Sequence, residues 1–552
     1  MPPISHKQNP ERYRERLVSL EARVLHNSGD IRGLARPFEE FGPSADSGYI
    51  PAPEAGLGWS ATTNAFPLSR VAFRVPQLPV KDFAVWANET ISSNRPLFDR
   101  LGITSALEIY THVQIPRDYR SVIPLMSLWN RDSHTFVARF HEFTVTLLDV
   151  YVLTRLPLSG VEPLIVEEDG LNAEETRVLT LLLEGDKRAY THSRPVPNSW
   201  VAYFRHRFVN DVNTHVAAFL AVWLDQHVFP SSFCDPERGV SRRVFLIAAR
   251  LACGSRLALG AAYLGSLYWR LDQFSLDLQR SYGRFEVVSM VDIALLQVLL
   301  WEYFPMLAPF FKDSTGILTR EQLPRRAPER SRPRIFWWSR EQLPTRRRSI
   351  EEGLNSLDSF TPQPYNHGHP GLYFEPVYER FHVSFLFTPR PREMPFAIWA
   401  HPVVLSLLSG SLPALKESTG GGPLWDREAY NPQRVLSQFG MAQHVPTKST
   451  PLSATEIDRR FLTCHLRSHA YPVHLLRPCE SSVLVVTPSY MKYWAKLESS
   501  FREFRDAMKT SSTPPSVYTS DLTLLGKLFG RNFVCVLCLH TFICLFFLPS
   551  FL

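Results

Sequence analysis

Two cysteines and two histidines recur every five residues in the C-terminal part of the chain: Cys464, His469, His474 and Cys479. Two thiolates and two imidazoles are a ligand set that can hold zinc in tetrahedral geometry. Common zinc fingers, however, pair their cysteines about two to four residues apart, and no such pair accompanies these four residues. The spacing therefore favours ordinary core cysteines and surface histidines, with a zinc site as the weaker hypothesis.

The residue types and spacings in the sequence give little support to an enzymatic function. A pyridoxal-phosphate enzyme needs a lysine for the Schiff base, an acidic residue near the ring nitrogen and a phosphate-binding helix start. The three glycines at 420–422 precede Pro423, which suits a loop better than such a helix start. His134 and His141 are interpreted as packing or surface residues. The candidate lysines all lie in polar, loop-like contexts: Lys187, Lys312, Lys416 and Lys448. We therefore predict a non-enzymatic protein without a cofactor.

Arginine is concentrated in one segment. Residues 320–348 contain ten Arg and three Glu, and this excess equals the net charge of +7 of the whole chain. Charge therefore does not support a broad nucleic-acid-binding face. The segment resembles a spread nuclear-import signal that can also contact phosphates non-specifically, and Phe336, Trp337 and Trp338 could stack on bases. Alternatively, these aromatic residues anchor the segment while its arginines stay solvated. The residues assigned to import or phosphate contact are Arg325, Arg326, Arg330, Arg332, Arg334, Arg346, Arg347 and Arg348.

The chain ends in a hydrophobic tail. Residues 532–552 are 21 residues without a charge, preceded by Lys527 and Arg531. As a helix the tail spans ~31 Å, about one hydrocarbon core of a bilayer. Basic residues on its N-terminal side are typical of a tail anchor whose bulk stays in the cytosol. The alternative is an unusual C-terminus without a membrane role.

Composition indicates a folded protein with a large core. The 552 residues are 45% hydrophobic and 12% aromatic, which argues against disorder. Seven cysteines without regular spacing favour a reducing compartment, and the first residues lack the apolar run of a secretory signal. We predict a mainly α fold with a few short β-strands or hairpins, an α+β protein with a single large helical core domain.

Three apolar segments predict the helices of this core: 212–229, 243–271 and 287–304. Charged residues interrupt them, and their uncharged runs are shorter than the ~20 residues that a bilayer needs. We therefore predict buried helices rather than membrane spans. The sequence GAAYLG at 260–265 has small residues that would let another helix approach closely.

Shorter elements are predicted around these helices. The residues from 97 to 128 are read as short helices broken at Pro116 and Pro124. Further helices are predicted at 11–25, 173–183, 431–445 and 490–509, a helix on both sides of Pro402, and a strand at 381–388.

The stretch 129–160 is expected to position its neighbours. Phe143, Val145 and Leu147 alternate with threonines, a pattern typical of a half-buried strand at the end of a β-hairpin. Thr146 with Asp149 three residues later predicts a capped helix start. Pro157 and Gly160 are expected to stop this helix. We assign Thr146 and Asp149 a structural role.

Composition shifts divide the chain into six segments. In chain order they are a charged helix with a Pro/Gly/Ser-rich arm (1–79), the N-terminal part of the core domain (80–311), an Arg/Pro-rich connector (312–370), the C-terminal part of the same domain (371–509), a polar linker (510–531) and the hydrophobic tail (532–552).

Six blocks of sequence, in this order, resemble the plant mobile domain, the aminotransferase-like domain of MAIN-like proteins and of certain plant transposable elements. The blocks are TFVARFHEFTVTLLDVYVLTRLPLSG, AFLAVWLDQHVFP, ALGAAYLGSLYWRLD, LLQVLLWEYFP, NPQRVLSQFGMAQHVP and PSYMKYW. The resemblance covers residues 80–508. The sequence departs from the family at Leu148, where an acidic residue is usual, at His141 or Glu142, where the hairpin turn usually has Gly, and at Arg155, another usual Gly.

The resemblance implies a function but no active site. Domesticated members of the family are associated with nuclear roles in transposon silencing, genome stability and meristem maintenance, and act with a phosphoprotein-phosphatase-like partner. No catalytic residues are established that could be carried over. We therefore expect a non-enzymatic, transposon-derived or domesticated nuclear protein that acts through protein partners, with weak non-specific nucleic-acid contact. The alternatives are a protein anchored to a membrane by residues 532–552 and a metal- or pyridoxal-dependent enzyme.

Overall fold

The computed structural model describes the chain in separate stretches: 71–73, 81–166, 170–189, 197–230, 239–281, 286–309, 311–313, 316–318, 334–339, 350–354, 356–365, 410–416, 424–439, 443, 445–446, 484, 486 and 488–510. Within these stretches the protein is mainly helical, with short strands in small sheets. The predicted fold class is confirmed. By compactness the chain divides into Met1–Phe501 and Arg502–Leu552, and the elements below belong to the first unit, except for the end of the last helix.

A small antiparallel sheet and the helix after it organise their surroundings. β2 (Trp129–Asn130), β3 (Thr135–Val137) and β4 (Glu142–Phe143) are hydrogen-bonded in that order. Helix α8 (Leu147–Thr154) follows directly. Both the sheet and the helix are buried, so their polar side chains must find partners inside the protein.

Helix α8 begins at the predicted cap. The Thr146 hydroxyl accepts a hydrogen bond from the Asp149 amide, and the Asp149 carboxylate accepts one from the Thr146 amide at 2.7 Å. The helix ends at Thr154, before Pro157, so the predicted stop lies too far along the chain. The reason is Arg155, which adopts the left-handed backbone conformation with φ of 57° and closes the helix.

The predicted half-buried strand through residues 143–147 is wrong. β4 ends at Phe143, and Thr144 and Thr146 are as buried as the apolar residues between them. The amide of Thr144 donates to Oε1 of Gln438 at 2.9 Å, and Nε2 of Gln438 donates to the Thr144 carbonyl at 2.9 Å. The side-chain amide of Gln438 therefore makes the two backbone hydrogen bonds that a neighbouring strand would make.

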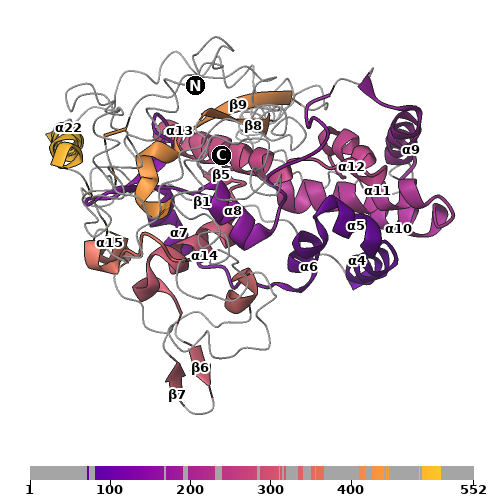
Figure 1. Ribbon diagram of the computed structural model, residues 1–552, viewed down its shortest axis with the longest axis horizontal. Coiled ribbons are helices and arrows are strands. Elements are labelled where there is room, and N and C mark those ends of the chain that lie inside the picture. The colour runs from indigo at the N-terminus through magenta and orange to yellow at the C-terminus, as the bar shows by residue number, and fades with distance from the viewer. Residues whose placement is uncertain are drawn as a thin grey trace, which may run out of the picture. The chain divides into compact units, whose positions relative to one another are not determined.

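A long helix carries a β-hairpin on one side. β8 (Gly410–Lys416) and β9 (Leu424–Tyr430) pair in antiparallel fashion, and β8 packs against α13 (Leu259–Ser281) (Figure 1). A Cβ on Gly265 of this helix would lie 2.3 Å from the Pro413 carbonyl oxygen. The small residues at 260–265 therefore allow close approach, as predicted, but not of a second helix. Strand β8 approaches at Gly265, and a loop approaches at Gly260.

Most other helices gather at one end of α13, where Figure 1 shows α4 to α6 beside α9 to α12. Buried side chains of these helices belong to one continuous hydrophobic core. Their bounds are α4 (Lys81–Ser93), α5 (Arg95–Leu101), α6 (Thr104–His112), α9 (Ala173–Ala189), α10 (Pro197–Arg207), α11 (Val212–Trp223), the π-helical turn η3 (Leu224–Val228), the 3-10 turn η4 (Arg242–Val244) and α12 (Phe245–Ala252).

Several predicted helices differ from the observed elements. The segment 243–271 is divided into α12 and α13 by a turn at Gly254, whose φ of 101° no helix accommodates. The segment 287–304 begins as β5 (Val287–Ser289), which pairs in parallel with β1 (Val71–Phe73), before α14 (Ile293–Tyr303) starts.

Two proline-containing segments also differ. The segment 431–445 contains the 3-10 helix η10 (Pro432–Phe439), with a non-helical kink at Val435, instead of an α-helix. Pro124 lies inside α7 (Tyr119–Met126), which continues to Met126, so the predicted break at Pro124 is wrong.

The remaining described elements follow α14. They are the 3-10 turn η5 (Pro305–Leu307), the hairpin of β6 (Phe311–Asp313) and β7 (Gly316–Leu318), η8 (Arg334–Trp338), α15 (Ile350–Leu354), η9 (Leu357–Ser359) and the final helix α22 (Pro488–Thr510). Buried residues before, within and after the connector (Trp223, Trp338 and Phe439) belong to the same core.

Several predictions concern residues outside the described stretches. These are the helix at 11–25, the strand at 381–388, the helix around Pro402, the polar linker and the hydrophobic tail. The four zinc candidates (Cys464, His469, His474 and Cys479) and all assigned arginines except Arg334 also lie outside them.

Candidate functional site

The turn between β2 and β3 presents a histidine to the interior. Oδ1 of Asn130 accepts hydrogen bonds from the amides of Asp132 and Ser133 at 3.1 and 2.9 Å, which fixes the turn. His134 follows in the left-handed region with φ of 53°, a conformation that histidine tolerates better than most residues. Its side chain is buried. Of the two predicted alternatives, a packing residue or a surface residue, only the first therefore holds.

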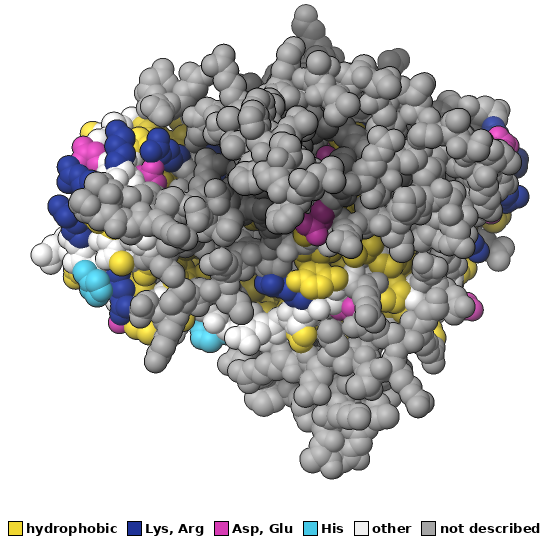
Figure 2. All heavy atoms as spheres, turned by 180° about the vertical axis from the view of Figure 1, so that it is seen from behind, with side chains coloured by type: hydrophobic (Ala, Val, Ile, Leu, Met, Phe, Trp, Pro, Cys, Tyr) yellow, Lys and Arg dark blue, Asp and Glu magenta, His cyan; other side chains and the backbone are white. Residues whose placement is uncertain are grey.

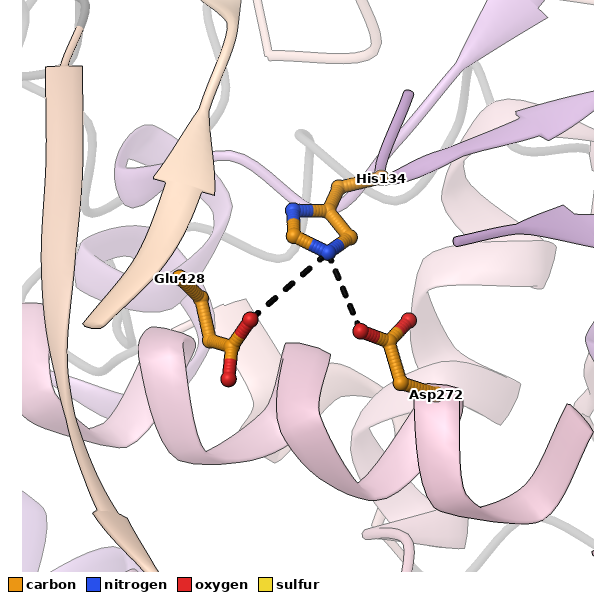
Figure 3. A group of neighbouring side chains, drawn as sticks. All are labelled: His134, Asp272 and Glu428. Carbon is orange, nitrogen blue, oxygen red and sulfur yellow. Dashed lines mark hydrogen bonds and ion pairs between the residues drawn. The ribbon is translucent and has the colours of Figure 1, made fainter. Parts of the chain in front are cut away.

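His134 meets two carboxylates that are distant in sequence. Its Nε2 lies 3.1 Å from Oδ2 of Asp272 on α13 and 3.7 Å from Oε2 of Glu428 on β9 (Figure 3). The exposed fractions of the three side chains are 8%, 16% and 10%. The ligand atoms all lie within 4.8 Å of one another, close enough to hold one metal ion.

Each member of this trio is also held from outside. Nδ1 of His134 donates to the Ala429 carbonyl at 2.8 Å. Nε1 of Trp129 donates to Oδ1 of Asp272 at 2.7 Å, and Nζ of Lys416 lies 2.7 Å from Oε1 of Glu428. These contacts occupy the outer atoms of the trio, which are Nδ1 of His134, Oδ1 of Asp272 and Oε1 of Glu428. The inner atoms, Nε2, Oδ2 and Oε2, face one another.

Charge dominates the behaviour of the trio. Burial alone lowers the pKa of His134, but the hydrogen bond and charge of Asp272, with the Ala429 carbonyl and Glu428, raise it above its usual value. Burial raises the pKa of Glu428, although the Lys416 ammonium opposes this. The site is therefore one that favours a cation at Nε2.

A buried ion pair lies on the other side of the same sheet. Nε and Nη2 of Arg434 donate to the two oxygens of Glu142, each at 2.7 Å, and the two side chains are 1% and 0% exposed. Thr135 donates to the same carboxylate at 2.8 Å, and Nη2 of Arg434 donates to the Tyr493 hydroxyl at 2.6 Å. This bidentate pair connects the sheet to η10 and α22.

Asp149 forms a second buried anionic centre. Besides its contacts with Thr146, its Oδ1 accepts hydrogen bonds from the hydroxyls of Tyr303 at 3.0 Å and Tyr365 at 2.7 Å. Burial raises the pKa of Asp149, while these hydrogen bonds oppose the shift. Since Nε2 of Gln438 donates to the Tyr303 hydroxyl at 2.6 Å, the cap of α8 is connected to η10.

His141 is a further buried polar side chain of the sheet region. Its two ring nitrogens lie 2.8 Å from the Tyr490 hydroxyl and 2.9 Å from the Ser437 hydroxyl. Burial lowers the pKa of His141 to about 3. The imidazole is therefore neutral at physiological pH and serves packing, as predicted; it does not lie on the surface.

Acid is expected to destabilise the fold through His141. In the unfolded chain an imidazole binds a proton below about pH 6.5, whereas the folded state holds His141 neutral down to about pH 3. Between these values, each unit by which the pH falls lowers the free energy of unfolding by about 1.4 kcal/mol for one such group. The variant His141→Gln should lose this slope in urea denaturation at pH 7, 6 and 5. The control Tyr490→Phe keeps the imidazole and should keep the slope; an equal slope in His141→Gln would refute the assignment.

Phe336 and Trp338 of the connector pack against the core. Trp338 is buried, its ring lies 5.2 Å from that of Trp301, and its Nε1 donates to Oε1 of Glu302 at 2.7 Å. Phe336 is half-buried against the same core. The base-stacking alternative is therefore wrong for Trp338, which has no exposed face.

Charged side chains at the helical end mostly pair with one another. Seen from behind, some Asp and Glu side chains lie among the Lys and Arg side chains at this edge (Figure 2). Arg177 binds Glu174 and Asp211, both at 2.7 Å, and Arg242 binds Asp186 at 2.6 Å. This edge is therefore not a basic face for nucleic acid.

The sequence did not predict the buried partners of His134 and Glu142. Asp272, Glu428 and Arg434 each contact the sheet from more than a hundred residues away. No local spacing marks such contacts, and Asp272 and Glu428 have the pattern of ordinary surface acids in their helix and strand. The only local signal was the conspicuous density of polar residues in the stretch 129–160.

No helix among the described stretches is both long and apolar enough to cross a membrane. Comparison with known families gives a match. The family model described as PMD, plant mobile domain, matches residues 102–495. No curated protein and no solved structure matches the chain.

Proposed function

The chain belongs to the plant mobile domain family, and we propose that it acts in the nucleus through protein contacts and not through catalysis. The family is a transposon-derived domain that is not known as an enzyme family. The proposed processes are transposon silencing, genome stability and meristem maintenance, and the proposed partner is a phosphoprotein-phosphatase-like protein. Weak, non-specific contact with nucleic acid through the connector is a minor part of the proposal.

The observation that supports a non-catalytic domain is how its buried ionisable groups are used. Glu142 is bound by Arg434 and Thr135, Asp149 by two tyrosines and its own helix cap, and His141 by two hydroxyls. A catalytic acid or base needs access to a substrate proton within hydrogen-bonding reach. Groups enclosed by protein partners hold the core together instead.

A nuclear location is supported by the connector. Trp338 fixes this segment to the core at η8, close in sequence to the arginines assigned to import. The family resemblance supports the same location. Import therefore depends, in this proposal, on residues 312–350 and not on the folded core.

Substitution of the arginines tests this proposal. The full chain carrying Arg346→Ala, Arg347→Ala and Arg348→Ala, fused to a fluorescent reporter, should shift from the nucleus to the cytosol of plant cells. Lysine at the same three positions keeps the charge and should keep import. A reporter fused to residues 312–350 alone should enter nuclei. Exclusion of the unaltered full chain from nuclei would contradict the proposal.

The uncharged run 532–552 favours one alternative, a membrane-anchored protein. Carbonate extraction of cell membranes distinguishes the two. The nuclear proposal expects the full chain in the soluble fraction, as for a chain that ends at Ser520. Retention of only the full chain in the membrane pellet would support the anchor.

A further inference from the structure

Three side chains from three separate elements point their inner atoms at one centre. They are His134 in the turn between β2 and β3, Asp272 on α13 and Glu428 on β9 (Figure 3). Imidazole nitrogen and carboxylate oxygen are ligands that zinc accepts together. Nothing in the proposed function uses this arrangement.

The distances fit a single small ion. Zinc binds nitrogen and oxygen at about 2.0–2.2 Å, so neighbouring ligand atoms of a tetrahedral site lie about 3.4 Å apart. The distances of 3.1 and 3.7 Å from Nε2 of His134 to Oδ2 of Asp272 and Oε2 of Glu428 lie on either side of this value. The third separation, between the two carboxylates, is at most 4.8 Å. A small shift of Glu428 brings all three within bonding distance of one ion.

The outer contacts orient each ligand as they do in metal sites. Metal-binding histidines commonly donate their other ring N–H to a carbonyl or carboxylate, which fixes the tautomer. Nδ1 of His134 does this with the Ala429 carbonyl, and so directs the lone pair of Nε2 to the centre. Trp129 and Lys416 hold the outer oxygens of Asp272 and Glu428 and leave the inner oxygens free to bind.

The charges also require a cation there. With a neutral imidazole, the two carboxylates leave at least one negative charge in a mostly buried space, even when the Lys416 ammonium, which also binds Asp426 at 2.7 Å, is counted in full. An uncompensated buried charge is costly. Either a proton on Nε2 or a metal ion balances it, and the two compete for the same lone pair.

We propose that His134, Asp272 and Glu428 bind one zinc ion, which ties the β2–β3 turn to α13 and to the β8–β9 hairpin. The burial of the trio indicates a stabilising ion and not one that meets a substrate. The site is distinct from Cys464, His469, His474 and Cys479, the zinc candidates of the sequence.

The test measures zinc bound to the purified full-length protein. The protein is stripped with a chelator, incubated with zinc sulfate, desalted and analysed by mass spectrometry of the metal. One zinc ion per chain is expected in the wild type, with a higher melting temperature than the stripped protein. Asp272→Asn keeps an oxygen for Trp129, and Glu428→Gln is isosteric. Both should lose the zinc ion and the thermal shift. His134→Asn, which tolerates the left-handed backbone, should do the same.

A double variant, Cys464→Ser with Cys479→Ser, separates the two candidate sites and should keep its zinc. Three results overturn the proposal. The first is a wild-type chain that binds no zinc and shows no thermal shift, which means that a proton balances the site, and the second is zinc retained by Asp272→Asn and Glu428→Gln. Zinc lost only from the cysteine variant would likewise refute it.

Discussion

Glu142→Gln is expected to lower the free energy of unfolding of the core by about 3–5 kcal/mol, the range for breaking a buried ion pair. Glu142 is completely buried, and it is the carboxylate that both Nε and Nη2 of Arg434 contact. Removing its charge leaves a guanidinium in the interior without a counter-ion. The loss should appear as an earlier transition in urea denaturation followed by tryptophan fluorescence.

Two further variants separate the charge effect from packing. Glu142→Leu combined with Arg434→Met removes both charges, and apolar pairs of similar volume often replace a buried ion pair at little cost. The double variant should therefore be more stable than Glu142→Gln. The exposed pair of Arg188 and Glu184 is the surface control, where Glu184→Gln should cost below about 1 kcal/mol. A loss of the same small size at Glu142 would mean that the pair is not enclosed as described.

Asp149→Ala is the second large effect that we expect, a loss of about 3–5 kcal/mol from an unmade helix cap and two or more buried donors without an acceptor. The substitution removes the acceptor of the Thr146 amide and of the Tyr303 and Tyr365 hydroxyls. All three donors are buried.

Asp149→Asn is the matched control. An asparagine keeps one oxygen for the Thr146 amide, and its amide group can donate to a tyrosine hydroxyl. It should therefore lose less stability than alanine in the same urea denaturation. If both variants were as stable as the wild type, the Asp149 centre would not support the core.

The helix cap at Thr146 could be predicted from sequence because its two residues are three positions apart and act locally. Arg155 shows the limit of such reasoning. It occupies a position where the family usually has Gly, and the left-handed backbone there explains that preference. Only the structure shows that the helix ends at this residue and not at Pro157.

The wrong prediction of a strand through residues 143–147 has a different cause. Alternation of apolar and polar residues predicts one solvent-exposed face, but the hydroxyls of Thr144 and Thr146 donate inside the protein to the His134 carbonyl and to Oδ2 of Asp149. A threonine with a buried partner looks the same in sequence as one facing water. The trio of His134, Asp272 and Glu428 was missed for a related reason, because its members are brought together only by the packing of α13 and β9 against the turn.

The central claim, that the folded domain works through a protein partner in the nucleus, is tested most directly by affinity purification from plant nuclei. The full chain is expressed with a tag, and the proteins that copurify are identified and quantified by mass spectrometry. Asp149→Ala, expected to weaken the core, serves as the matched control. We expect a phosphoprotein-phosphatase-like protein enriched with the wild-type chain and depleted with the variant. Equal recovery with both chains, or no such protein with either, would contradict the claim.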